Sequence, residues 1–249
     1  MKKISEHTIR KMTYWFMLLS FIVPVGFLIY RIAVTENVAV GGIGYRSRAD
    51  YTLMLVQCLL GAVVLHVPYF FRKYLKIEIP TLLYMMYIIF LYCAIFLGEV
   101  RSFYYKVPYW DKWLHGFSAV MAGSFGFILI DVLNNFNNIG IKLSPIFTAM
   151  FAFCFAISIG VLWEIYEYAF DFVLGLNMQK FMLEDGTQLI GRAALDDTMK
   201  DIIIDCCGSM LAAIIGYISI KRHQKRELIK QTPHLAHAVS PYGMEEGEE

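Results

Sequence analysis

Six long apolar runs, separated by short polar segments, dominate the pattern of hydrophobic and polar positions along the chain. They cover Tyr14–Tyr30, Tyr51–Phe71, Ile79–Gly98, Trp113–Ile130, Leu143–Trp163 and Ile202–Ile220. Each run has 17 to 21 residues, and a helix of that length crosses a hydrocarbon core of about 30 Å. The pattern therefore predicts an all-α integral membrane protein, a bundle of about six transmembrane helices.

The basic residues in the connecting segments predict the orientation of this bundle. If the N-terminus lies in the cytoplasm, 13 of the 22 Lys and Arg residues fall on the cytoplasmic side and 9 on the other. Basic residues are enriched in cytoplasmic loops, so we expect both termini to be cytoplasmic. We expect residues 1–230 to form one polytopic domain and residues 231–249 to form a disordered polar and acidic cytoplasmic tail.

Composition agrees with a membrane protein and excludes two other classes. The chain is 58% hydrophobic and 17% charged, with a net charge of +1, and no basic domain or stripe indicates nucleic-acid binding. Its five cysteines include no Cys-x-x-Cys spacing, so the sequence predicts neither a disulfide framework nor a zinc ribbon. A chain with these runs is expected to be a multi-pass membrane protein.

Acidic residues and one histidine interrupt the apolar pattern in three places. The motifs are Asp111-Lys112-x-x-His115 at the start of the fourth helix, Glu164-x-x-Glu167-x-x-x-Asp171 at the end of the fifth, and Asp197-x-x-x-Asp201-x-x-x-Asp205 at the start of the sixth. Residues three or four positions apart share one face of a helix, so each motif predicts a polar stripe. The fourth and sixth helices enter the membrane from the side at which the fifth leaves it. We therefore expect the three stripes to meet at one face of the bilayer.

The negative charge of seven carboxylates gathered at the membrane surface must be neutralised. Charged groups inside a membrane are costly, and carboxylates close together also repel one another. Lys112, Arg101 and Lys200 are too few to neutralise the set, whereas a divalent cation would do so. Many oxygen ligands with a single histidine favour Mg²⁺, Mn²⁺ or Ca²⁺ over Zn²⁺.

The three motifs also carry a family resemblance. Trp110-Asp111-Lys112-x-x-His115, Trp163-Glu164-x-x-Glu167-Tyr168-x-x-Asp171 and Asp197-Thr198-Met199-x-Asp201-x-x-x-Asp205-x-x-Gly208 resemble the YjdF-like family of bacterial inner-membrane proteins over roughly residues 80–220. The resemblance implies a six-helix, multi-pass protein of the bacterial cytoplasmic (inner) membrane and carries no catalytic role with it. The Asp-Lys-x-x-His opening is also similar, more loosely, to that of VanZ-like membrane proteins.

We expect the acidic site to act on or recognise a lipid or isoprenoid phosphate at the extracytoplasmic face, with a membrane lipid or lipid-linked molecule as its partner. The expected metal ligands are Asp111, His115, Glu164, Glu167, Asp201 and Asp205, and the expected catalytic residues are His115, Asp111 and Glu167. Asp171, Asp197 and Lys112 would support these ligands or line the entrance. Histidine is the side chain that exchanges protons most readily near neutral pH.

Two other functions remain open from the sequence. A transporter or proton-coupled carrier would use the same acids as a relay, and it predicts a polar path to the cytoplasmic face. A non-enzymatic membrane scaffold would use the cluster only to fix helix packing. Two local interpretations also stay open: Glu99 either joins the cluster or stands apart at the interface, and the stretch Lys180–Arg192 forms either a small hairpin over the site or a plain connection.

Overall fold

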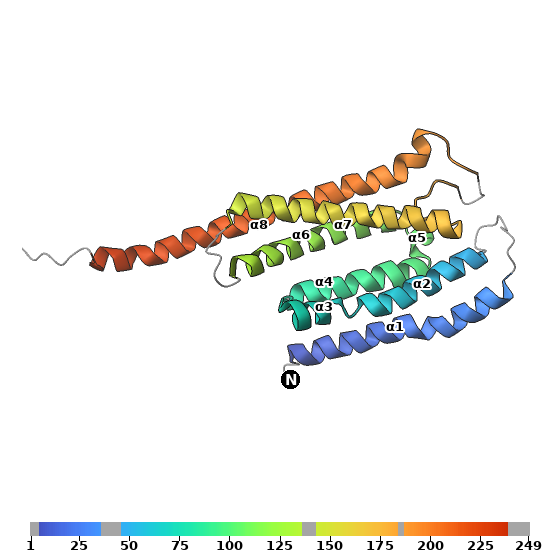
Figure 1. Ribbon diagram of the computed structural model, residues 1–249, viewed down its shortest axis with the longest axis horizontal. Coiled ribbons are helices and arrows are strands. Elements are labelled where there is room, and N and C mark those ends of the chain that lie inside the picture. Colours follow the sequence, from blue (N-terminus) through green and yellow to red (C-terminus); the bar gives the residue numbers. More distant parts are fainter. Residues whose placement is uncertain (1–4, 36–45, 136–142, 184–186, 239–249) are drawn as a thin grey trace, which may run out of the picture.

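The computed structural model describes residues 5–35, 46–135, 143–183 and 187–238, and it is helical almost throughout (Figure 1). The elements are α1 Glu6–Val34, α2 Arg48–Val64, α3 Val67–Phe70, η1 Phe71–Leu75, α4 Thr81–Leu91, η2 Tyr92–Val100, α5 Phe103–Lys106, α6 Trp110–Asn135, α7 Pro145–Leu174 and α8 Arg192–Ala238. The described residues form no β-strand, and one isolated bridge joins Met182 to Gln188. The all-α prediction is confirmed.

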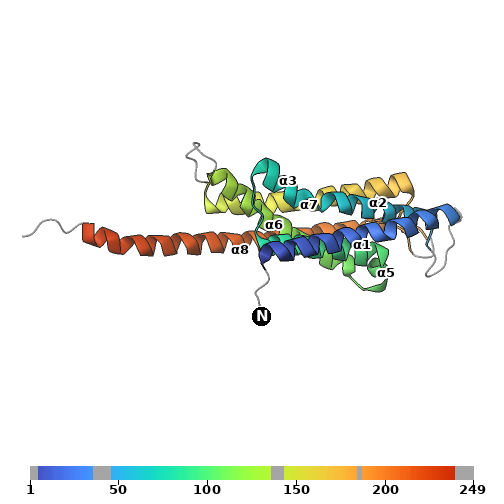
Figure 2. The same ribbon diagram turned by 90° about the horizontal axis from the view of Figure 1, so that it is seen from below.

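Six helical segments are long and apolar enough to cross a membrane. They are Thr8–Val34, Arg48–Leu75, Thr81–Val100, Trp110–Asn134, Pro145–Leu174 and Arg192–Lys230. They match the six predicted runs in order: the third is shifted by two residues, the fifth begins two residues later and ends eleven later, and the other four are longer at both ends. The described beginning of α1 and the described end of α8 lie towards the same end of the bundle (Figures 1 and 2), as an even number of spans requires.

Local sequence signals set several helix ends. Ser47 and Asp50 form a reciprocal capping box at the start of α2, which satisfies two backbone N–H groups that have no partner within the helix. Ser144 accepts a hydrogen bond from the backbone N–H of Phe147, and Pro145 follows it at the first helical position, where a missing N–H costs nothing. Gly175 ends α7 with φ +64°, a conformation that glycine adopts without strain.

Two of the predicted runs are less regular than the apolar pattern indicated. The second span breaks after Val64, and the short helix α3 begins at Val67 with Pro68 in its first turn, because proline cannot donate the hydrogen bond that a continuous helix needs. The third span changes from α-helix to π-helix at Tyr92. The guanidinium of Arg46 donates to the carbonyls of Glu99 and Val100 at the end of this π-helix, so carbonyl groups there have a partner.

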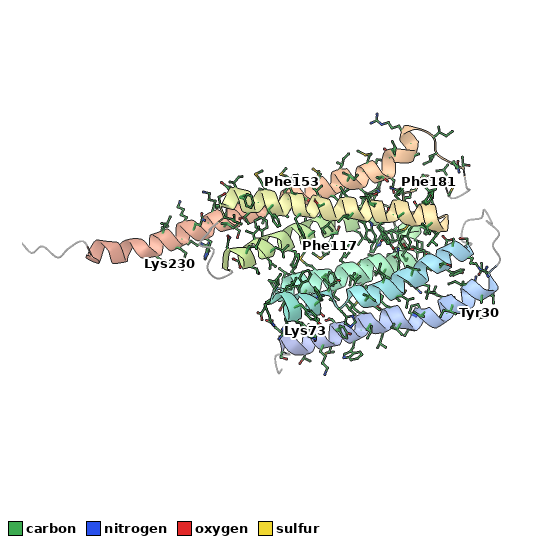
Figure 3. All side chains as sticks on the ribbon, viewed as in Figure 1. Tyr30, Lys73, Phe117, Phe153, Phe181 and Lys230 are labelled. Atoms are coloured by element: carbon green, nitrogen blue, oxygen red, sulfur yellow. The ribbon has the colours of Figure 1, made fainter. Side chains whose placement is uncertain are left out.

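The six spans divide into two groups with different packing. In the N-terminal group, large side chains of α1 and α4 such as Phe21 and Tyr84 form a common core. In the C-terminal group, α6, α7 and α8 each contact the other two, and small residues form the closest approaches, as between Gly123 and Ala212. Aromatic stacking joins the groups: Phe117 of α6 lies 6.5 Å from Phe90 of α4, ring centre to ring centre (Figure 3).

The last helix is longer than the span that was predicted for it. α8 runs from Arg192 to Ala238, and its second half projects beyond the other helices (Figures 1 and 2). The segment for which we predict a disordered tail therefore begins inside this helix. Residues 239–249, the rest of that segment, lie outside the described residues.

Candidate functional site

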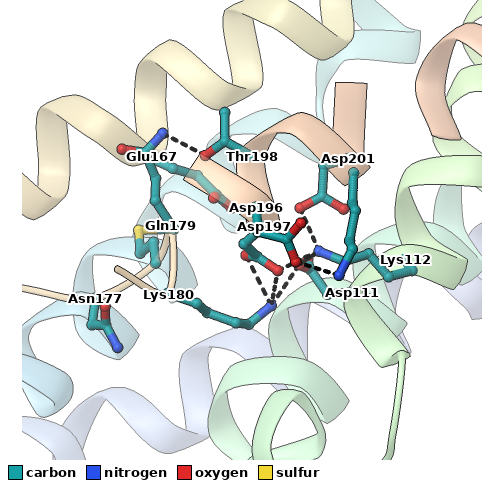
Figure 4. Close-up of polar contacts among 12 residues, drawn as sticks. Asp111, Lys112, Glu167, Asn177, Gln179, Lys180, Asp196, Asp197, Thr198 and Asp201 are labelled. Carbon is teal, nitrogen blue, oxygen red and sulfur yellow. Dashed lines mark hydrogen bonds and ion pairs between the residues drawn. The ribbon is translucent and has the colours of Figure 1, made fainter. Parts of the chain in front are cut away.

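The three polar stripes meet where α6 begins, α7 ends and α8 begins. Asp111, His115, Glu164, Glu167, Asp171, Asp201 and Asp205 are all buried there. The segment between α7 and α8 covers the same end and adds a lysine to the cluster (Figure 4). The convergence of these helix ends, expected from the spacing and from the alternation of the spans, is therefore present in the fold.

His115 stands at the centre of the cluster, and Asp205 holds one side of its ring. Nδ1 of His115 lies 3.1 Å from Oδ2 of Asp205. Asp205 fits against α7 because residue 160 is glycine: a Cβ at Gly160 would lie 2.2 Å from Oδ2 of Asp205. A carboxylate on one ring nitrogen fixes both the orientation of an imidazole and its tautomer, and turns the other nitrogen to a defined position.

The other ring nitrogen of His115 faces three carboxylate oxygens. Nε2 lies 3.6 Å from Oε1 of Glu164, 3.8 Å from Oδ1 of Asp111 and 3.9 Å from Oδ1 of Asp201. These distances exceed those of hydrogen bonds, so a proton on Nε2 would have no close acceptor. The arrangement instead leaves a space that one nitrogen and three oxygens surround.

Several oxygens around this space have no hydrogen-bond partner. Both carboxylate oxygens of Glu164 are buried without a hydrogen bond of ordinary geometry, although the side chain of Thr198 is near enough to interact with this carboxylate. Oδ1 of Asp201 and Oδ1 of Asp205 are also buried and unpaired. Glu164 is only 4% exposed and Asp201 is fully buried. A buried ionised carboxylate without a donor or a cation is strongly unfavourable. The described side chains therefore leave the electrostatic demand of this cluster incompletely met.

Two lysines neutralise the outer part of the cluster. Nζ of Lys112 lies 2.5 Å from Oδ1 of Asp197 and 2.6 Å from Oδ2 of Asp201. Nζ of Lys180 lies 2.8 Å from Oδ2 of Asp111 and 3.3 Å from Oδ2 of Asp197 (Figure 4). The two ammonium groups thus share Asp197, and each also contacts an aspartate that faces His115.

Lys180 was not among the residues that the sequence singled out. It comes from the segment after α7, where Asp171 accepts hydrogen bonds from the backbone N–H groups of Met178 and Gln179. Asn177 pairs with the backbone N–H and carbonyl of Met182. Burial lowers the pKa of Lys180, but the negative charges of Asp111 and Asp197 outweigh that effect, so its pKa lies above the ordinary value. Lys180 therefore stays cationic at neutral pH.

The segment that carries Lys180 is partly hairpin-like. The backbone N–H of Leu183 donates to the carbonyl of Thr187, and that of Leu189 donates to the carbonyl of Phe181. Residues 184–186, on which the hairpin signal rests, lie outside the described residues. Of the two interpretations that the sequence left open, the contact of Lys180 with the cluster favours a structured cover over a plain connection.

The other predicted site residues lie at the edge of the cluster. Oε1 of Glu167 accepts a hydrogen bond from the indole N–H of Trp163 at 2.9 Å. Asp171 binds the backbone of the covering segment, as described above. Glu99 stands apart: Nε2 of Gln57 lies 3.3 Å from its Oε1, so its side chain is held within the N-terminal group of helices.

Tyr104 is a second residue that the sequence analysis missed. Its ring lies against Gly98, where a Cβ would be 2.4 Å from the ring. Burial raises the pKa of the Tyr104 phenol well above its ordinary value, and the charges of Glu99, Asp111 and Glu167 raise it further. The phenol therefore lies within the electrostatic reach of both Glu99 and the cluster, and it stays protonated.

One set of residues has the geometry of a cation site. Asp111, His115 and Asp201 each offer one ligand atom, and these atoms lie within 4.8 Å of one another. Oε1 of Glu164 lies 3.6 Å from Nε2 of His115, but Glu164 is not a member of this set. Helix spacing predicted all four residues, and the structure brings them together around Nε2 of His115.

Comparison with known proteins places the chain among membrane proteins. No solved structure matches it. A protein of Thermotoga maritima, described as uncharacterized, is 31% identical over 153 residues, which are 60% of this chain and 69% of that protein. A family model described as "predicted membrane protein (DUF2238)" matches residues 12–222, which include all six spans almost completely and every residue of the acidic cluster. The chain belongs to the DUF2238 family of predicted membrane proteins.

Proposed function

We propose that this membrane protein binds one divalent cation between Asp111, His115, Glu164 and Asp201, and uses it to act on or recognise a phosphate-bearing lipid or isoprenoid. The observation that supports the proposal is the surroundings of Nε2 of His115. Three carboxylate oxygens face this nitrogen at 3.6 to 3.9 Å without hydrogen-bonding to it. Adjacent ligands of a bound divalent cation are about 3 to 3.5 Å apart, given metal–ligand distances of about 2.0–2.6 Å. Asp111, His115 and Asp201 already offer ligand atoms within 4.8 Å of one another, so a bound cation would draw these three groups together and Glu164 in towards them.

This geometry gives Asp205 a different role from the one we predicted. Asp205 contacts Nδ1 of His115, on the opposite side of the ring from the three oxygens, so in this proposal it orients the histidine and is not itself a ligand. Carboxylates that hold a metal-binding histidine in this way strengthen it as a ligand. Three oxygens and one nitrogen keep Mg²⁺, Mn²⁺ or Ca²⁺ favoured over Zn²⁺.

The packing below the site supports a closed site over a transport path. A Cβ on Gly208 would lie 2.9 Å from the Cβ of Ala119, and one on Gly126 would lie 2.9 Å from the Cα of Ala152. These contacts join α6, α7 and α8 on the cytoplasmic side of Asp205 in our expected orientation. Among the described residues on that side of Asp205 in these helices, two polar side chains are buried, Ser209 of α8 and Thr148 near the start of α7. A carrier would need a continuous series of such groups.

The depth of the site supports a lipid ligand. The cluster lies at the ends of three spans, where a bilayer carries its phosphate groups, and the covering segment leaves Lys180 39% exposed beside it. Glu167 lies one helical turn outward from Glu164 and remains our candidate for proton transfer, while Asp111 and His115 act as ligands. We place the protein in the bacterial inner membrane with this site extracytoplasmic. The YjdF-like and VanZ-like resemblances remain predictions.

Cation binding to the purified full chain tests the first part of the proposal. We expect Mn²⁺ to bind at one site, measured by the loss of the free-ion signal in electron paramagnetic resonance. Glu164→Gln and Asp201→Asn each remove a ligand charge and should weaken binding at least about tenfold, since an interaction with a charged group contributes about 1.5–3 kcal/mol. Asp196→Asn is the matched control, because Asp196 is exposed and pairs with Lys200. Absence of binding, or equal affinity in all four proteins, would refute the cation site.

Lipid binding tests the second part. The protein is reconstituted in nanodiscs of phosphatidylcholine with a small fraction of phosphatidic acid, which carries a phosphomonoester. We expect the fraction of phosphatidic acid among the lipids that copurify with the chain to exceed the fraction supplied for reconstitution when Mn²⁺ is present. After chelation by EDTA, the two fractions should be equal. Equal enrichment with and without the cation would separate lipid binding from the metal site and contradict the proposed function.

A further inference from the structure

We propose that Lys112 and Lys180 form the phosphate-binding part of the site, and that Asp197 occupies this place until a phosphate displaces it. The proposal rests on the proposed function, because the phosphate would also contact the cation. It adds a defined position for the anion and assigns one carboxylate as an internal substitute for it. Asp197, Lys112 and Lys180 carry the argument, and all three lie within one set of ion pairs (Figure 4).

Two aspartates join the cation space to the lysines. Asp111 turns Oδ1 towards Nε2 of His115 and Oδ2 towards Lys180. Asp201 likewise turns Oδ1 towards Nε2 and Oδ2 towards Lys112. The ammonium groups are thus separated from the cation space by the width of a single carboxylate. A phosphate group is of similar size, so it can contact the cation with one oxygen and an ammonium group with another.

The charges around His115 leave Asp197 as the surplus anion. Four carboxylates contact the histidine, from Asp111, Glu164, Asp201 and Asp205. One divalent cation and the two ammonium groups balance their formal charge of −4 when the histidine is neutral. Asp197 contacts both lysines but does not contact His115. Glu167 pairs with Trp163, and Asp171 accepts hydrogen bonds from two backbone N–H groups. Neither acid contacts a cationic side chain among the described residues, so both stand outside this count. The surplus negative group therefore lies where an incoming anion would gain most from the two ammonium groups.

Asp197 is also the cluster carboxylate that is best placed to move. It lies near the start of α8, and its side chain is 15% exposed, against 12% for Asp111, 1% for Asp201 and 3% for Asp205. Its Oδ2 has no hydrogen bond and only the ion-pair contact with Nζ of Lys180 at 3.3 Å. A side chain at the edge of the cluster reaches water by a change of rotamer, whereas Asp201 and Asp205 are enclosed by packed helices. Displacing Asp197 would exchange one anion for another without leaving the lysines unpaired.

Lys180 is held ready for this role by its backbone. Asp171 and Asn177 fix the segment around it through four hydrogen bonds to backbone groups. Nε2 of Gln179 donates to Oγ1 of Thr198 and ties the segment to α8. Lys180 itself has φ 51°, a conformation that is unfavourable for a residue with a side chain. A lysine ammonium is a compact charge suited to binding phosphate oxygens, and here its position is fixed before a ligand arrives.

Phosphate affinity of the Mn²⁺-loaded full chain tests the proposal, with inorganic phosphate as the first probe and calorimetry as the measurement. Asp197→Asn removes the competing anion, and we expect the affinity for phosphate to rise about tenfold. Lys180→Gln should lower it about tenfold, because an ion-assisted hydrogen bond is lost. Lys180→Arg keeps the charge and should retain most of the affinity. Asp196→Asn and Lys200→Gln change the neighbouring exposed pair and should leave phosphate binding unchanged.

Copurified phosphatidic acid is the second probe and separates two sources of the phosphate. A response of both probes to the variants means that the phosphate group alone is recognised; a response of the lipid alone means that its acyl chains are also needed. Both results support the proposal. It is overturned if Asp197→Asn fails to tighten binding, or if Lys180→Gln binds both probes like the unaltered protein, while Mn²⁺ affinity is retained. Failure of the unaltered chain to bind Mn²⁺ would instead refute the proposed function on which this inference rests.

Discussion

The two groups of helices in this protein differ in what their glycines contact. In the N-terminal group, glycine makes room for large side chains: a Cβ on Gly61 would meet Ile95 at 2.6 Å and Phe21 at 3.2 Å. In the C-terminal group, several glycines bring one helix directly against the next, as where Gly126 faces the backbone of Ala152, although Gly216 makes room for the ring of Phe127. Small residues allow close helix approach in membranes. Close approach in turn brings charged groups of three helices within a few ångströms of one another.

The comparison shows how each group accommodates its buried polar and charged side chains. Polar groups of the N-terminal group are mostly paired with backbone, as Arg46 is with two carbonyls at the end of η2. The C-terminal group instead gathers buried carboxylates around His115 and leaves oxygens of Glu164, Asp201 and Asp205 without partners. Both groups leave buried polar atoms unpaired, Nε of Arg31 and Oγ1 of Thr35 in the first, but those of the second are mainly carboxylate oxygens, which gain from a cation. We therefore expect substitutions in the two groups to separate stability from ligand binding.

The largest effect is expected from Lys112→Met. It leaves the buried carboxylates of Asp197 and Asp201 without this cation, and breaking a buried ion pair costs about 3–5 kcal/mol. The free energy of unfolding in mixed detergent micelles measures the loss. Lys200→Met is the control, because Lys200 pairs with the exposed Asp196 and such pairs contribute about 0–1 kcal/mol. An equal loss of unfolding free energy in the two variants would mean that Lys112 stabilises the buried cluster no more than Lys200 stabilises the surface.

A smaller effect should distinguish glycines of the two groups. Gly208→Ala places a Cβ 2.9 Å from that of Ala119 and 3.0 Å from the carbonyl oxygen of Gly116, and overpacking of this kind costs about 1–3 kcal/mol. Gly26→Ala in α1 meets nothing within 4 Å, so the better helix propensity of alanine should stabilise α1 by about 0.5–1 kcal/mol. Thermal melting curves in one detergent compare the two. A tolerated alanine at position 208 would contradict close packing of α6 against α8.

The smallest effect is expected from Gln57→Leu in the N-terminal group. The substitution removes the donor to Glu99 and should cost about 1 kcal/mol, the contribution of an ordinary hydrogen bond. The affinity for Mn²⁺ should not change, because Glu99 lies outside the cation site. Unfolding and Mn²⁺ titration on the same preparation measure both quantities. A drop in Mn²⁺ affinity without a larger loss of stability would show that the two groups are coupled. The N-terminal group would then contribute to cation binding and not only to stability.

Much of the fold and part of the site followed from spacing alone. The apolar runs were long enough to require spans, and their alternation placed the three acidic stripes at one end. His115 and Asp201 could be grouped because their helices enter from the same side. Lys180 could not, because the segment that carries it has no helical period, and its position depends on how Asp171 caps that segment. Helix spacing also could not tell which nitrogen of His115 meets Asp205, since that depends on side-chain rotamers.

Irregular backbone was the other feature that could not be predicted from the sequence. The second apolar run gave no sign of where the helix breaks apart from Pro68, and the widened turns of η2 leave no mark in a pattern of apolar residues. The interaction of Glu99 with Gln57 depends on these turns and on Arg46. These features arise from contacts between elements, so local spacing carries no information about them.

The length of α8 has a mechanical consequence. The segment Arg192–Lys230 has 39 residues and no proline, so it is about 60 Å long, roughly twice the thickness of the hydrocarbon core. One end holds Asp197 among the lysines, and the other projects past the remaining helices to Lys230 (Figure 3). An unbroken helix tilts and rotates as a rod. Any shift of the first turns of α8 would therefore displace its C-terminal part on the other side of the bilayer, where this helix projects beyond the others.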